Sequence, residues 1–299
     1  MNRYISPLRY PGGKACIFRF VANLFYENNL IGINYAEPYA GGAGLALRLL
    51  ADEYVSNIYI NDYDRSIYAF WHTILNDKND FCSWIENVDV SVETWRHYKA
   101  IQNDAPNHGL FELAQSTFFL NRTNVSGVIT GGIIGGLNQH GKYKIDVRFN
   151  KKALIARIER IYQFRNRIKV SNEDGLDFVK KMNLWGNDLF IYLDPPYYQK
   201  GADLYMNFYA EKDHKKLSDY VHGLRKKWMV SYDNHDFILN LYPENQKIVH
   251  TLSQSTSNRV GDELLIFPDN ITLNESLLKL KSPAFLTHPT SRCVGRGSV

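Results

Sequence analysis

The sequence has few cysteines and no long hydrophobic run. Its three cysteines, Cys16, Cys82 and Cys293, are scattered over 299 residues and odd in number. They show neither metal-ligand spacing nor a disulfide framework, which favours a reducing cytoplasm. No stretch approaches the roughly 18 consecutive apolar residues of a membrane-spanning helix. The opening MNRYISPLRY lacks the apolar core of a signal peptide. We therefore expect a cytoplasmic protein without a membrane segment or a metal centre.

The net positive charge is small overall, but it is concentrated in one segment. The formal net charge of +4 is too small to indicate a polyanionic partner by itself. Between Gln115 and Val170, eleven basic residues face only Asp146 and Glu159, an excess of nine (eleven minus two). The eleven are Arg122, Lys142, Lys144, Arg148, Lys151, Lys152, Arg157, Arg160, Arg165, Arg167 and Lys169. This segment predicts a phosphate-binding footprint, with a solvated helix face over residues 150–167 as the alternative.

Strand-like and helix-like segments alternate in two parts of the chain. Short apolar runs such as 58–60 and 190–193 lead into polar or glycine turns, which predicts βαβ units and a parallel sheet. Residues 77–169 lose this rhythm and predict helices followed by hairpins and loops. We expect one α/β domain from residues 1–76 and 170–270, with 77–169 inserted into it. Residues 271–299 fit no element well and are predicted to form a peripheral tail.

The first glycine turn only approaches a phosphate-binding loop. Lys14 follows Gly12 and Gly13, as it would in that motif. However, Leu8 stands where the motif needs a glycine, and Ala15 replaces its Ser or Thr. A nucleotide triphosphatase is therefore not expected.

The second glycine turn, AGGAGLAL, approaches the dinucleotide fingerprint. Gly42 and Gly44 supply its first two glycines, but Leu47 replaces the third, which argues against NAD. Asp62 lies 20 residues beyond Gly42, where an acid can accept hydrogen bonds from both hydroxyls of a ribose. Together they predict an adenosine-containing cofactor. The alternative is an ordinary βα turn with a helix N-cap at Asp62.

The stretch FIYLDPPYYQ ends an apolar strand on an acid. Asp194 stands at the carboxyl end of that strand, where ligands bind in open α/β sheets. Pro195 and Pro196 remove backbone donors and fix φ, which leaves a carboxylate, carbonyl acceptors and the flat face of Tyr197. Such acceptors suit the exocyclic amine of a purine or cytosine, which must become tetrahedral to attack a methyl group. A turn with a solvent-facing acid is the alternative.

These motifs, in this order, resemble those of Dam-like (D12 class, alpha group) adenine-specific DNA N6-methyltransferases. The resemblance covers about residues 3–270 and is carried by LRYPGGK, EPYAGGAGLALRL, INDYD, FFLNRTNVSG, DPPY and VSYDNHD. It implies a Rossmann-like S-adenosylmethionine-dependent sheet with an inserted helical and β-hairpin DNA-recognition domain. It also implies double-stranded DNA as the partner of a bacterial or phage-encoded monomer or weak dimer. The sequence leaves open whether a companion restriction endonuclease exists.

The resemblance also implies roles for individual residues. The catalytic set that binds the target adenine would be Asp194, Pro195, Pro196 and Tyr197. The cofactor would contact Tyr10, Lys14, Glu37, Pro38, Ala40, Gly41, Gly42, Gly44, Asp62, Asp174 and Asp194. Glu173 and Asp177 compete with Asp174 for the place near the adenine of the cofactor. DNA would contact Asn121, Arg122, Lys142 and Lys144. The glycine-rich stretch after Gly127 departs from the family pattern, so the recognised sequence cannot be carried over.

The implied mechanism extrudes one adenine from the duplex and stacks it on Tyr197. The aromatic stretch 197–209 would either close over the base or simply pack on the surface. Three alternatives remain. The motif alone does not exclude a cytosine-N4 methyltransferase. A protein or RNA methyltransferase would carry a related NPPY-type strand end. A catalytically silent DNA-binding regulator would use the same scaffold.

Overall fold

A mixed sheet of eight strands forms the centre of the described structure. The computed structural model describes residues 5–10, 12–186, 188–199, 209–253 and 260–286. The strands lie in the order β3-β2-β1-β4-β5-β7-β6-β8. They are β1 Ile33–Glu37, β2 Val55–Asn61, β3 Ile168–Ser171, β4 Leu189–Leu193, β5 Lys227–Asp233, β6 Gln246–Ser253, β7 Val260–Phe267 and β8 Ala284–Phe285. The first five are parallel, and β7, β6 and β8 add antiparallel pairs. The predicted α/β fold is confirmed.

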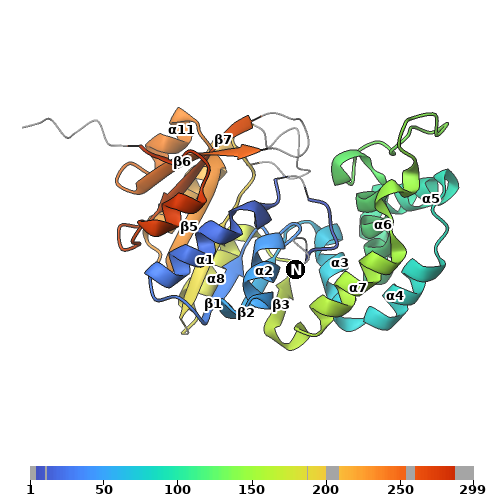
Figure 1. Ribbon diagram of the computed structural model, residues 1–299, viewed down its shortest axis with the longest axis horizontal. Helices are drawn as coiled ribbons and strands as arrows, with labels where there is room; N and C mark the ends of the chain where they lie inside the picture. Colours follow the sequence, from blue (N-terminus) through green and yellow to red (C-terminus); the bar gives the residue numbers. More distant parts are fainter. Residues whose placement is uncertain (1–4, 11, 187, 200–208, 254–259, 287–299) are drawn as a thin grey trace, which may run out of the picture.

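Helices cover both faces of this sheet. In chain order they are α1 Phe18–Glu27, α2 Gly44–Ala51, α3 Arg65–Asn76, α8 Gly175–Leu184, α10 Glu211–His222 and α11 Asp236–Leu241. Figure 1 shows α1 and α2 lying over β1 and β2. Their side chains share one buried cluster with Tyr35 and Phe190, whereas those of α8, α10 and α11 share another with Ala36 and Ile191. No helix in the described ranges is long and apolar enough to cross a bilayer.

Strand β4 explains why FIYL is apolar without interruption. Successive side chains of a strand point to opposite faces, and here helices cover both faces. All five residues of β4 are buried, and Tyr35 pairs with Phe190 in the register with β1. The strand ends at Leu193, so Asp194 is the first residue beyond the carboxyl end, as the sequence predicts.

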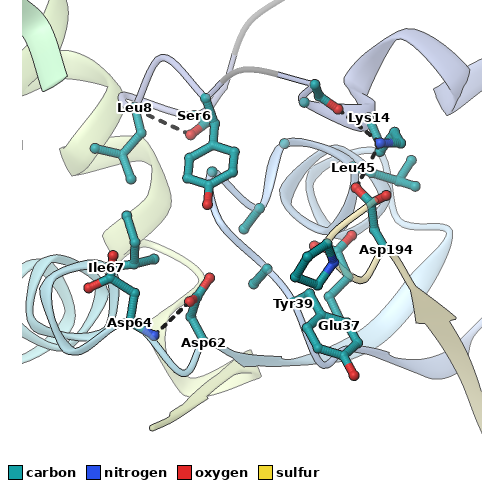
Figure 2. A pocket seen from close by; sticks show the side chains of 18 of the residues that line it. Ser6, Leu8, Lys14, Glu37, Tyr39, Leu45, Asp62, Asp64, Ile67 and Asp194 are labelled. Atoms are coloured by element: carbon teal, nitrogen blue, oxygen red, sulfur yellow. Dashed lines mark hydrogen bonds and ion pairs between the residues drawn. The ribbon is translucent and has the colours of Figure 1, made fainter. Parts of the chain in front are cut away.

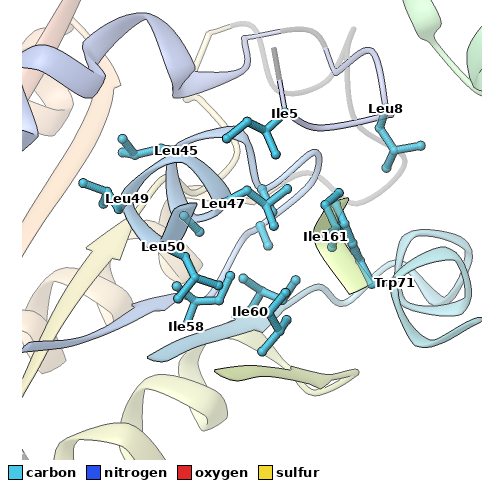
Figure 3. Close-up of a cluster of buried hydrophobic side chains, with 14 of the residues drawn as sticks. Ile5, Leu8, Leu45, Leu47, Leu49, Leu50, Ile58, Ile60, Trp71 and Ile161 are labelled. Atoms are coloured by element: carbon cyan, nitrogen blue, oxygen red, sulfur yellow. The ribbon is translucent and has the colours of Figure 1, made fainter. Parts of the chain in front are cut away.

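The segment inserted after α3 is helical and continues the core of the sheet. Its helices are α4 Lys78–Asn87, α5 Val92–Asn103, α6 Leu110–Thr123 and α7 Lys151–Tyr162, drawn on the right of Figure 1. Phe70 of α3 stacks on Phe118 of α6 with ring centroids 5.6 Å apart. Figure 3 shows Ile161 of α7 and Trp71 of α3 in the same cluster as Ile60 of β2. The insert is therefore packed on the sheet domain through α3.

The predicted β-hairpins of the insert are wrong. Residues 118–123 belong to α6, and residues 124–148, all of them described, contain only one isolated bridge, between Asn124 and Ile133. Side chains take the place of a strand ladder here. Asn124 Nδ2 donates to Val128 and Ile129 carbonyls, and Gln139 Nε2 donates to Ile134 and Gly136 carbonyls. Amide side chains that bond nearby backbone favour turns, so the apolar and glycine pattern was misleading.

The prediction of a peripheral tail also needs correction. Residues 271–286 pack against α1 and add β8 to the sheet edge, while residues 287–299 lie outside the described residues. Ile271 and Ser276 are buried. Glu27 at the end of α1 accepts hydrogen bonds from the backbone nitrogen and hydroxyl of Ser276. These contacts join segments far apart in sequence, so local pattern could not reveal them.

Candidate functional site

A pocket of about 1110 Å³ lies over the carboxyl ends of β1, β2 and β4. In the sheet, β2 and β3 lie on one side of β1, and β4 and β5 lie on the other. The strand order therefore reverses beside β1, which is the position where α/β sheets bind ligands. Figure 2 shows Asp194 and Lys14 on one side of it, Asp62 and Asp64 on another, and Glu37 with Tyr39 between them. One cavity thus joins the two regions that the sequence assigns to a cofactor and to a base.

The glycine turn after β1 lies directly under Tyr10. Gly41 has a φ of +47°, and a Cβ added to it would lie 2.5 Å from the Tyr10 ring. A Cβ on Gly42 would lie 2.9 Å from Tyr10 Cβ. Trp71 Nε1 donates to Gly41 O over 2.9 Å and holds the turn from beneath. The turn needs glycine because a side chain would displace Tyr10 from the pocket wall.

Glu37 forms the acidic floor of the pocket. Its Oε1 accepts hydrogen bonds from Tyr35 OH at 2.8 Å and from Ala46 N at 3.1 Å. Burial raises the pKa of the Glu37 carboxyl to about 8. The group is therefore predominantly protonated near neutral pH when the pocket holds no cation.

Asp62 lines the pocket and does not cap the helix that follows. The N-cap of α3 is Asp64, which accepts from Ser66 N. Asp62 instead accepts from Gly41 N at 2.8 Å and from Asp64 N at 2.9 Å. Burial, followed by the nearby Asp64 charge, raises the pKa of Asp62 to about 7. Each carboxylate oxygen keeps a second lone pair for a ligand hydroxyl.

Asp174 is the pocket acid among the three candidates after β3. Its Oδ1 caps α8 by accepting from Leu176 N and Asp177 N. Glu173 pairs with Lys181, Asp177 pairs with Lys180, and neither residue lines the pocket. Gly175 beside Asp174 packs against Tyr39, whose ring lies 2.4 Å from where a Cβ would be.

Asp194 is held from both sides. Its Oδ2 lies 2.7 Å from Lys14 Nζ, and its Oδ1 accepts from Ser231 Oγ at 2.6 Å. Tyr192 OH and Ser231 Oγ are hydrogen-bonded at 2.8 Å, which places the hydroxyl of Ser231. Burial raises the pKa of Asp194, Lys14 opposes this, and Glu263 adds to it. Figure 2 shows the Lys14 to Asp194 contact at the pocket wall.

Glu263 of β7 is the site residue that sequence reasoning missed. It is 2% exposed, and its Oε1 lies 3.1 Å from Lys14 Nζ and accepts a hydrogen bond from Tyr197 OH. Tyr197 OH is also 2.9 Å from Lys14 Nζ. His250 Nε2 lies 3.6 Å from Glu263 Oε2 without a hydrogen bond. Burial and Lys14 lower the pKa of His250 to about 4, so this contact is not an ion pair at neutral pH. The only available signal was an acid inside the apolar run of DELLIF.

The remaining predicted site residues differ in where they lie. Pro196, Ala40 and Gly44 line the pocket. Pro38 and Pro195 do not, and Pro195 is buried. Lys142 and Lys144 are exposed outside the pocket. Residues 200–208 of the aromatic stretch lie outside the described residues.

Asn121 and Arg122 have structural roles that the sequence did not predict. Asn121 is 1% exposed and bonds the backbone of Arg9 twice, at 2.8 Å from both its nitrogen and its oxygen. Arg122 is 8% exposed and donates to the carbonyls of Arg148 and Pro7. The prediction that Asn121 contacts DNA directly needs correction, because its side-chain amide is already hydrogen-bonded inside the protein.

The strand order and this pocket define a Rossmann-like α/β scaffold with a ligand site at the switch point. A family model for D12 class N6 adenine-specific DNA methyltransferases matches residues 10–256, so the chain belongs to that family. The family predicted from the sequence is confirmed. Membership of this family supports the interpretation that the protein is an enzyme that methylates DNA.

Individual relatives are more distant. The Type II methyltransferase M.CviBI of Paramecium bursaria Chlorella virus NC1A is 24% identical over 244 residues, which are 77% of this chain and 85% of the relative. Solved structures include TrmN from Thermus thermophilus, with a TM-score of 0.36 at 8% identity, covering 82% of this chain and 47% of that one. The rRNA methyltransferase aviRa from Streptomyces viridochromogenes has a TM-score of 0.33 at 9% identity, covering 84% of each chain. These structural similarities are too low to add to what the sheet itself shows.

Proposed function

We propose that the protein transfers a methyl group from S-adenosylmethionine to the N6 amine of an adenine extruded from duplex DNA. The observation that carries the proposal is the single pocket that contains both Asp62 and Asp194. A cofactor held at Asp62 and a base held at Asp194 would share one cavity, which is what direct transfer between them requires. The family to which the chain belongs supports the same reaction.

The chemistry of the pocket fits S-adenosylmethionine. When bound, this cofactor supplies the methyl group as a sulfonium cation. Glu37, Asp62 and Asp194 provide an acidic lining that suits a cation, and the free lone pairs of Asp62 suit the hydroxyls of its ribose. Asp174 lines the same pocket, and an acceptor of this kind suits the amino group of the cofactor's adenine.

Asp194 would orient the target amine. Its carboxylate accepts hydrogen bonds from the N–H groups of the amine, which favours the tetrahedral nitrogen needed for attack. Lys14 and Ser231 hold the carboxylate in one orientation, so this ordering does not have to occur during the reaction. Positioning of two reactants contributes up to roughly 7–11 kcal/mol to catalysis, which makes rigid placement the main task of the site.

Sequence specificity is part of the proposal. The relative M.CviBI carries the name Type II methyltransferase. We extend the proposal to methylation at one short DNA sequence. Single-molecule sequencing of DNA from cells that express the protein would report the base, its position and the motif. Chromatography of the nucleosides would separate N6-methyladenine from N4-methylcytosine.

The test of the catalytic assignment is Asp194→Ala with labelled S-adenosylmethionine. Transfer to DNA should fall by at least about 100-fold, because the reacting amine loses its main acceptor. The matched control is Asp188→Ala, which changes an exposed acid at the opposite end of β4. Near wild-type transfer by the Asp194 variant would refute the role of Asp194. Methyl transfer to cytosine instead of adenine would refute the proposed base.

A further inference from the structure

Four arginines gather on the side of the pocket that the insert contributes. Arg9 comes from the segment before the first glycine turn, Arg122 from α6, Arg148 from the 3-10 turn Ile145–Arg148, and Arg157 from α7. All four line the same cavity as Asp62 and Asp194. We call this set the arginine wall. The sequence drew attention to Arg122 and to the basic segment but not to this convergence.

The arginine wall is built into the fold by backbone contacts. Arg122 Nε donates to Arg148 O over 2.8 Å, and Arg9 Nη1 donates to Asn124 O over 3.3 Å. Arg157 Nη1 donates to Ser6 O over 3.3 Å. Asn121 fixes the backbone of Arg9 against α6. The guanidinium groups are thus gathered before any ligand arrives.

The wall carries positive charge that the described protein does not neutralise. No carboxylate in the described ranges forms an ion pair with any of the four arginines. Burial, then the charges of Arg9, Arg157 and Arg148, lower the pKa of Arg122 to about 9. Arg157 Nε is buried without a hydrogen-bond partner. Clustered guanidinium groups without a carboxylate partner at a cavity edge favour binding of an anion.

We propose that the arginine wall binds a backbone phosphate of the nucleotide whose base enters the pocket, an inference that rests on the proposed function. Glu37, Asp62 and Asp194 come from the ends of sheet strands, whereas the arginines of the pocket come mainly from the insert. A nucleotide has the matching division, with a neutral base on one side and an anionic phosphate on the other. Guanidinium groups match phosphate geometry with paired N–H donors. The phosphate contact anchors the backbone while the base reaches Asp194.

Arg148→Gln and Arg157→Gln test the wall. The Arg148 side chain makes no hydrogen bond or ion pair in the described structure, so its loss should not disturb folding. Each variant should weaken binding of duplex DNA about tenfold and reduce the slope of log affinity against log salt by about 1. Fluorescence anisotropy of a labelled duplex at several salt concentrations measures both. Calorimetry should give unchanged affinity for S-adenosylmethionine.

The matched control is Lys152→Gln, which removes one charge from an exposed position of α7 outside the pocket. Its DNA affinity should change less than about twofold. Wild-type affinity and salt slope in both arginine variants would overturn the phosphate site. An equal loss of S-adenosylmethionine affinity would also overturn it, because the wall would then bind the cofactor carboxylate. If Arg157→Gln unfolds in a thermal melt, Arg148→Gln decides alone. A wild-type protein that neither binds nor methylates duplex DNA would instead refute the proposed function.

Discussion

Glu263 should control the reaction although it faces Lys14 and Tyr197 and not the pocket. Glu263→Ala removes a buried carboxylate that contacts Lys14 Nζ at 3.1 Å and accepts from Tyr197 OH. Breaking a buried ion pair costs roughly 3–5 kcal/mol. The lower end applies here, because Lys14 keeps Asp194 at 2.7 Å and Gly12 O at 3.0 Å. A loss of about 3 kcal/mol should lower Tm by about 6 °C.

The catalytic effect of Glu263→Ala should exceed its effect on substrate binding. Without Glu263, Lys14 and Tyr197 lose a shared partner. Lys14 keeps its contact with Asp194, but its own position is less fixed, so that Lys14 and Asp194 can shift together. A misplacement of about 1 Å costs about 100-fold in rate. Steady-state methyl transfer should therefore show a kcat about 100-fold lower, with KM for DNA nearly unchanged.

Glu263→Gln separates charge from geometry. Glutamine keeps the Oε1 acceptor for Lys14 and Tyr197 but removes the negative charge that raises the pKa of Asp194. The acidic limb of the kcat profile should move to lower pH. Asp262→Asn is the matched control, since its side chain is exposed on the opposite face of β7. Wild-type kcat in Glu263→Ala at a temperature below its Tm, or an acidic limb that moves upward in Glu263→Gln, would refute this reasoning.

Two further predictions concern the acids of the pocket. Asp62 has a pKa of about 7 and should bind ribose hydroxyls in its ionised form, so affinity for S-adenosylmethionine should fall about tenfold per pH unit below 7. Calorimetry should show weak binding without this pH dependence in Asp62→Asn, and a pH-independent wild type would contradict the assignment. Glu37→Gln should stabilise the cofactor-free protein, because the folded state holds a proton up to pH 8 that the unfolded chain releases near 4.5. Wild-type stability thus falls as pH rises from 4.5 to about 8, a difference of up to roughly 5 kcal/mol at pH 8. Both Glu37 hydrogen bonds use Oε1, which glutamine keeps; thermal melts in which the variant is less stable than wild type at pH 8 would exclude the effect.

The sheet could be predicted because its signals are local. Strand β4 is buried on both faces, and its continuous apolar run predicts this burial. The turns that follow β1 and β2 carry their glycines and acids within a few residues of the strand ends, so parallel strands bring them to one edge. Asp62, Asp174 and Asp194 consequently line one pocket, as their positions in the sequence suggested.

The errors arose where distant contacts decide the structure. Glycines and β-branched residues in 124–148 resemble hairpin sequence, but the amide side chains of Asn124 and Gln139 satisfy the backbone instead. Residues 271–286 look featureless alone and gain order from α1 and the sheet edge. Asn121 shows that a polar residue of a motif in a DNA-binding family can serve packing. Its burial depends on a partner segment more than 100 residues away.

Asp194, at the end of β4, is held by hydrogen bonds from the protein but keeps acceptor sites for a ligand. Lys14, 180 residues earlier in the chain, donates to Oδ2, and Ser231 donates to Oδ1. A carboxylate offers about four acceptor sites, so two remain for the incoming amine. The base therefore does not have to displace Lys14 in order to reach Asp194. Glu263 gives Lys14 a second anionic partner, so that the position of Lys14 does not depend on Asp194 alone. Fixed orientation and open acceptor capacity are both required of a group that must meet a weakly nucleophilic amine, and the geometry provides them together.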